Sequence, residues 1–144
     1  MTFPGRFLGI DYGTKRIGVA ISDENQTMAF PKEIVVNDSN AFEKIGDIIK
    51  KENISEIVIG ESVNFSGKSN VVSGRIEVFI LELKEKFKLP VHKEKEFLTS
   101  VEARRYQIKS GHVDASAAAL ILQRYLDKKN NRVYGVPYIN GTRT

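Results

Sequence analysis

Residues 8–23 read LGIDYGTKRIGVAISD, and this stretch decides the fold. An apolar run ends on Asp11, and a glycine turn follows at Gly13. Lys15 and Arg16 then lead into a second apolar run. A strand that enters the core of a sheet leaves its last side chain at the rim, where a carboxylate followed by such a turn can hold a metal ion or a phosphate. The alternative is an ordinary hairpin, in which Asp11 forms the turn and the two cations are solvated.

Composition limits the classes of protein to which this chain can belong. The chain has 144 residues, 41% of them hydrophobic, which suits one compact domain with its own core. It has no cysteine, which excludes thiol chemistry, and only two histidines, which argues against a zinc site built from histidines. Any metal would therefore be held by oxygen ligands, as Mg²⁺ and Mn²⁺ are. No run approaches the roughly 18 apolar residues of a membrane span, and the start of the chain does not resemble a signal peptide. We therefore expect a cytoplasmic protein without a membrane partner. Its net charge of +4 suits a polyanionic binding partner.

Hydrophobic periodicity predicts the order of the elements. Strands are expected at 7–11, 16–21, 28–36, 56–61 and 91–97, and helices at 40–53, 72–87, 100–110 and 113–125. Asn40 with Glu43, and Thr99 with Glu102, have the spacing of capping pairs. This order predicts an α/β fold with a five-stranded mixed sheet, its first three strands antiparallel, flanked by helices. We expect one domain over 1–127 and a polar, extended or flexible tail over 128–144.

Several acids are expected where strands end and helices begin, which is where chemistry gathers in such sheets. They are Asp11 at the end of the first strand, Glu61 at the end of the fourth, Glu96 near the end of the fifth, and Asp114 at the start of the last helix. Converging carboxylates repel one another unless cations neutralise them, and paired divalent ions are a recurrent device for phosphodiester cleavage. The alternatives are a dipole-favoured helix charge at Asp114 and surface acids at Glu61 and Glu96. Glu102 suits a cap better than a catalyst, and His112 suits a loop better than a phosphate contact.

Three segments resemble the YqgF/RuvX family in the same order. They are GIDYGTKRIGVAISD at 9–23, LTSVEA at 98–103 and VDASAAALILQ at 113–123, and the resemblance spans 8–127. It implies a ribonuclease H fold, similarity to Holliday junction resolvases, and magnesium-dependent phosphodiester hydrolysis that matures the 5′ end of pre-16S rRNA. Asp11 and Asp114 fall on the family's catalytic aspartates.

The chain departs from the family pattern at two places. Lys95-Glu96-Phe97 stands where the family reads Asp-Glu-Arg, and Gly60-Glu61-Ser62 stands where it reads Gly-Leu-Pro. Glu61 nevertheless occupies about the position of a catalytic glutamate in the related resolvases. The expected site therefore has Asp11, Glu61 and Asp114 as ligands of one or two Mg²⁺ or Mn²⁺ ions, Glu96 as a supporting or alternative ligand, and Lys15 and Arg16 as contacts to substrate phosphates.

Other functions fit parts of this pattern. One is a resolvase of branched DNA, and another is a catalytically silent module that binds nucleic acid through its basic residues. The Asp-x-Gly-Thr segment also resembles the first phosphate motif of the actin, Hsp70 and sugar-kinase superfamily, but this chain has room for about one of the two lobes and no second Asp-x-Gly motif. We expect RNA rather than branched DNA as the partner, and either a monomer or a homodimer.

Overall fold

The computed structural model describes residues 5–60, 70–94, 115–130, 132–133, 136–139 and 142–143. The expectations at Glu61, Glu96, Glu102, His112 and Asp114, and the helix at 100–110, lie outside these residues. In chain order the elements are β1 (Arg6–Asp11), β2 (Arg16–Ser22), β3 (Ala29–Val36), α1 (Ala41–Lys51), β4 (Ile54–Gly60), α2 (Asn70–Phe87), β5 (Val91–Lys93), α4 (Ala115–Lys129), β6 (Arg132–Val133), β7 (Val136–Ile139) and β8 (Thr142–Arg143). No helix in these described ranges is long and apolar enough to cross a bilayer.

The main sheet has five strands in the order β3-β2-β1-β4-β5. β2 is antiparallel to both β1 and β3, whereas β4 is parallel to both β1 and β5. The predicted mixed sheet with three antiparallel strands at its start is therefore confirmed. Its apolar strand β4 lies inside the sheet, with a strand on either side and a helical layer on each face.

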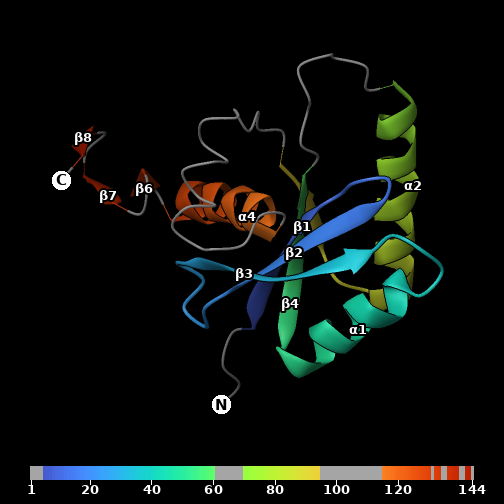
Figure 1. Ribbon diagram of the computed structural model, residues 1–144. Helices are drawn as coiled ribbons and strands as arrows, with labels where there is room; N and C mark the ends of the chain where they lie inside the picture. The colour runs from blue at the N-terminus through green and yellow to red at the C-terminus, as the bar shows by residue number, and fades with distance from the viewer. Residues whose placement is uncertain are drawn as a thin grey trace.

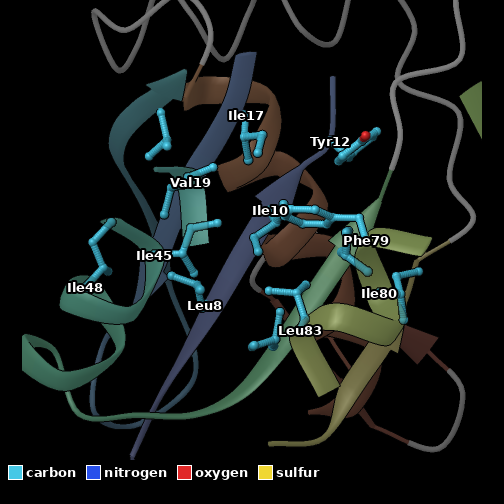
Figure 2. Close-up of a cluster of buried hydrophobic side chains, with 14 of the residues drawn as sticks. Leu8, Ile10, Tyr12, Ile17, Val19, Ile45, Ile48, Phe79, Ile80 and Leu83 are labelled. Carbon is cyan, nitrogen blue, oxygen red and sulfur yellow. The ribbon is translucent and has the colours of Figure 1, made fainter. Parts of the chain in front are cut away.

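Two helical layers cover the two faces of the sheet (Figure 1). One face packs against α1 and α2, with Leu8 and Ile10 of β1 in that core; Figure 2 shows them among side chains from both helices. The other face packs against α4 through Phe7 of β1 and Val58 of β4. Because side chains alternate along a strand, β1 contributes to both cores, and every second residue from Phe7 onward faces α4.

The local structure corrects some of the predicted detail. Asn40 precedes α1, but its side chain makes no capping hydrogen bond, because its backbone is already helical (φ −95°, ψ 0°). Its backbone N–H donates to Asp38 Oδ1 at 2.9 Å. The predicted pair with Glu43 is therefore wrong as a cap. Strand β5 covers only three residues and ends at Lys93. Helix α4 runs to Lys129, past the predicted end of this helix at Tyr125, and beyond it lie the short antiparallel strands β6, β7 and β8.

Candidate functional site

Asp11 is the last residue of β1, and its partners on both neighbouring strands are glycines. The register pairs it with Gly18 of β2 and with Gly60 of β4. Since Phe7 and Gly9 face α4, the alternation of side chains puts Asp11 on the same face. Its Oδ1 atom is buried. The carboxylate therefore lies at the rim of the sheet, below α4, with no side chain at the paired position on either side.

Two glycines allow α4 to lie close to the sheet. A Cβ atom added to Gly9 would be 2.7 Å from the Cβ of Leu122 and 2.9 Å from the carbonyl oxygen of Ala118. A Cβ added to Gly60 would be 3.1 Å from two methyl carbons of Ile121. Contacts between real Cβ atoms and other atoms are almost never shorter than 3.0 Å. Any larger residue at Gly9 would therefore displace the helix from the sheet.

The direction of α4 brings its first turn toward Asp11. The ring of Tyr125 packs on Phe7 with 5.9 Å between centroids, while the helix residues one and two turns earlier lie over Gly9. Moving from Phe7 toward Asp11 along β1 thus means moving toward the N-terminus of α4, which begins at Ala115. The unpaired amides of a helix N-terminus favour negative charge. This end of α4 is therefore suited to anionic groups.

The C-terminal half of α4 is anchored to the sheet by polar contacts. Gln123 Oε1 accepts a hydrogen bond from the amide of Ala29, and its Nε2 donates to the carbonyl oxygen of Thr27, both at 2.9 Å. Lys128 Nζ pairs with the buried Glu94 at 2.7 Å. These contacts fix the C-terminal half of the helix. The position of its first turn then depends on the packing of Ala118 and Leu122 against Gly9.

Tyr125 and His92 support this packing. Their rings stack with 5.0 Å between centroids, and His92 Nε2 lies 2.6 Å from Glu56 Oε1. Burial raises the pKa of the Tyr125 phenol, and the nearby carboxylates of Glu56 and Glu94 raise it further. The phenol therefore stays protonated at neutral pH, and the His92 ring packs against the ring of Tyr125.

The turn after Asp11 is held by an asparagine that the sequence did not single out. Asn37 Nδ2 donates to the carbonyl oxygen of Gly13 at 2.8 Å, and its backbone amide donates to that of Lys15 at 2.9 Å. A Cβ on Gly13 would be 2.5 Å from the carbonyl oxygen of Arg16, so the turn requires glycine. The side chains of Lys15 and Arg16 are exposed. By alternation along β2, Arg16 belongs to the face that carries Asp11.

The predicted site residues fall into two groups. Asp11 ends β1, Arg16 begins β2, and Lys15 lies in the turn between them. Glu61 follows Gly60 in the sequence and Asp114 precedes Ala115, but both lie outside the described residues, as does Glu96. Within the described ranges no three acids or histidines are arranged to hold a metal ion. The donor that is described, a partly buried carboxylate, is the oxygen ligand that Mg²⁺ and Mn²⁺ prefer.

This topology, with an acid at the end of the first strand and a helix packed over it, defines the ribonuclease H-like class. The chain is similar to T. thermophilus RuvC solved in complex with a Holliday junction, with a TM-score of 0.56 and 15% identity, over 87% of this chain and 95% of that one. It is also similar to the Fowlpox virus resolvase solved with Holliday junction DNA, with a TM-score of 0.54 and 13% identity, over 86% and 98% of the two chains. At these identities the likeness shows the fold.

The chain belongs to the RuvX family, described as Holliday junction resolvase, whose profile matches residues 5–128. A relative named "Putative pre-16S rRNA nuclease" from Thermoanaerobacter pseudethanolicus is 36% identical over 88% of this chain and 99% of that protein. One of the same name from Lawsonia intracellularis is 36% identical over 88% and 96%. The resemblance carried by the three motifs is confirmed. The chain is thus of a nuclease family, whose reaction is the hydrolysis of phosphodiester bonds.

Proposed function

We propose that this chain is a metal-dependent, cytoplasmic nuclease that acts on RNA and processes the 5′ end of pre-16S rRNA. The observation that carries the proposal is the position of Asp11, between two glycines at the rim of the sheet and on the face covered by α4. The names of the relatives support the choice of substrate.

Asp11, Glu61 and Asp114 would hold one or two Mg²⁺ or Mn²⁺ ions, with Glu96 as a supporting or alternative ligand. The parallel register of Asp11 with Gly60, the residue before Glu61, supports this set, as does the start of α4 directly after Asp114. Carboxylate oxygens are the donors that these ions prefer. When bound, such ions supply charge stabilisation at the phosphate and lower the pKa of water.

The other residues of the site would position the substrate. Arg16, on the face of Asp11, and Lys15 beside it are exposed cations that can contact backbone phosphates. Asn37 holds the turn that carries both, so their backbone is fixed before substrate arrives. Processing of one RNA end needs a single site, so a monomer would suffice, whereas paired cleavage of a four-way junction would need a homodimer.

The test is cleavage of two end-labelled substrates, precursor 16S rRNA and a DNA four-way junction, in Mg²⁺ or Mn²⁺ and in EDTA. The proteins compared are the wild type, Asp11→Asn, and Asp47→Asn, which changes an exposed acid on α1 and serves as the matched control. We expect metal-dependent cutting of the RNA that Asp11→Asn abolishes and Asp47→Asn retains. Cutting of the junction alone would indicate a resolvase, and binding without cutting would indicate a silent binding module.

Glu61→Gln and Glu96→Gln test the remaining ligands in the same assay. We expect Glu61→Gln to lose most of the metal-dependent cleavage and Glu96→Gln to lose less. Full activity of Glu61→Gln would remove Glu61 from the ligand set.

A further inference from the structure

A groove lies beside the first hairpin, on the face of the sheet that packs against α1 and α2. Its volume is about 390 Å³, and its lining residues are Tyr12, Asn37, Phe42, Gly74, Arg75, Val78, Phe79 and Glu82. They come from the turn after β1, the segment between β3 and α1, the start of α1, and α2. This volume lies at the lower end of the range for small-ligand sites, which suits one unit of a polymer rather than a folded partner.

The floor of the groove is aromatic. The rings of Tyr12 and Phe79 lie 4.9 Å apart between centroids, and those of Phe42 and Phe79 stack 5.0 Å apart with 28° between their planes. Figure 2 shows Tyr12 and Phe79 next to each other at the edge of this core. Phe42 is only partly buried. Its ring and the exposed Val78 therefore offer a flat apolar surface to a ligand.

The rim of the groove carries polar and cationic groups. Arg75 and Glu82 stand on α2, and Lys86 Nζ lies 5.5 Å from the centroid of the Phe42 ring. Asn37 lines the groove, and its backbone amide donates to the carbonyl oxygen of Lys15 at 2.9 Å. One cation, Arg75, and one acid, Glu82, thus line the groove beside its aromatic floor. Aromatic side chains are typical of single-stranded nucleic acid binding, because every base has a face that can stack.

The groove lies on the opposite face of the sheet from the Asp11 carboxylate, and Tyr12 lines it at the rim. Tyr12 follows Asp11 directly, and its amide extends the pairing of β1 by donating to the carbonyl oxygen of Gly60 at 3.0 Å. A strand of nucleic acid with a phosphate at Asp11 would have to pass over the rim of the sheet to place a nearby base at the mouth of the groove.

We propose that this groove binds one unpaired nucleobase of the substrate strand, next to the phosphodiester bond that is cut. The proposal rests on the nuclease function proposed above. The aromatic floor stacks with the base, and Arg75 and Glu82 offer a donor and an acceptor to its edge. The groove would thereby favour substrates that are single-stranded beside the cut, as sequence-specific RNA recognition commonly requires.

The test uses RNA oligonucleotides in which 2-aminopurine, whose fluorescence is quenched by stacking, replaces one base at each position around the cut. Binding is measured in EDTA, so that the measurement does not depend on cleavage. Gly74→Leu adds a side chain to an exposed helix position with nothing within 4 Å of its Cβ, so this variant should fold while obstructing the groove. Phe42→Leu removes the partly buried ring. Leu81→Ala truncates a side chain on α2 that is 64% exposed and does not line the groove, and it is the control.

We expect quenching at one or two positions beside the cut in the wild type and in Leu81→Ala. In Gly74→Leu and Phe42→Leu that quenching should be lost, and RNA affinity should fall about tenfold, the typical effect of losing one stacked base. Tight RNA binding with no quenched position, or quenching unchanged in both groove variants, would overturn the base site while leaving the nuclease function standing. If Gly74→Leu changed the oligomeric state and left the 2-aminopurine quenching unaltered, the groove would instead be a contact with a second copy of the chain. Failure of the wild type to bind RNA or to cut it would overturn both proposals.

Discussion

Substitution of Gly9 by alanine tests whether the close approach of α4 positions the site. The new Cβ would be 2.7 Å from the Cβ of Leu122, whereas ordinary contact begins at 3.4 Å, so α4 must retreat by about 0.7 Å. Overpacking of this kind costs about 1–3 kcal/mol of unfolding free energy. Because a 1 Å misplacement of catalytic groups can cost on the order of 100-fold in rate, we expect cleavage to fall by about ten- to 100-fold.

Three comparisons isolate the cause. Gly60→Ala should have a smaller effect on both quantities, because its Cβ would be 3.1 Å from two methyl carbons of Ile121 and 3.2 Å from the carbonyl oxygen of Glu94, all longer than the 2.7 and 2.9 Å contacts at Gly9. Adding Leu122→Ala to Gly9→Ala should not restore stability, since the Cβ of residue 122 and the carbonyl oxygen of Ala118 remain in place. Gly74→Ala, at an open helix position, should stabilise the fold by about 0.5–1 kcal/mol.

The measurements are urea unfolding monitored by circular dichroism and initial rates of RNA cleavage at saturating metal. A Gly9→Ala protein with wild-type unfolding free energy and wild-type cleavage would refute the reasoning. Rescue by Leu122→Ala would show that the contact is with a movable side chain rather than with the body of the helix.

Three further predictions concern the hairpin and the substrate. Asn37→Ala loses the 2.8 Å bond to Gly13 and should cost about 1 kcal/mol in urea unfolding and lower the cleavage rate; wild-type behaviour in both assays would contradict this. Burial raises the pKa of Asp23, but hydrogen bonds from the Thr27 amide, the Met28 amide and the Thr27 hydroxyl outweigh it and hold this pKa below its ordinary value. The carboxylate therefore stabilises the fold above about pH 4, and the stability difference between wild type and Asp23→Asn should shrink as pH falls from 5 to 3; a pH-independent difference would count against it. Arg16→Ala should weaken RNA binding and lower the slope of log affinity against log salt by about 1, whereas an unchanged slope would remove Arg16 as a phosphate contact.

Much of the fold is predictable because its elements carry clear periodicity. The apolar run ending at Asp11 and the run after Arg16 pair as the antiparallel strands that their glycine turn indicated. β4 is a nearly continuous apolar run, as is typical of a strand covered on both faces, and it lies inside the sheet. These features depend on residues close together in the sequence, where hydrophobic pattern and turn chemistry decide the structure.

The features that the sequence did not predict depend on distant residues. The sequence around Gly9 does not indicate that this residue contacts Leu122, because the two residues meet only when α4 packs on the sheet. Asn37 carries no motif, yet it fixes the turn at Gly13 across 24 residues. The side chain of Asn40 does not form the predicted cap, because the residue already has helical backbone angles. Tertiary packing decides such positions.

Binding of Mn²⁺ by isothermal titration calorimetry, with cleavage measured on the same samples, tests the central claim most directly. The proteins are the wild type, Asp11→Asn and the control Asp47→Asn, each checked for native circular dichroism. We expect the wild type and Asp47→Asn to bind one or two ions and to cleave RNA, and Asp11→Asn to lose at least one ion together with cleavage. Wild-type metal binding and cleavage by Asp11→Asn would contradict the account.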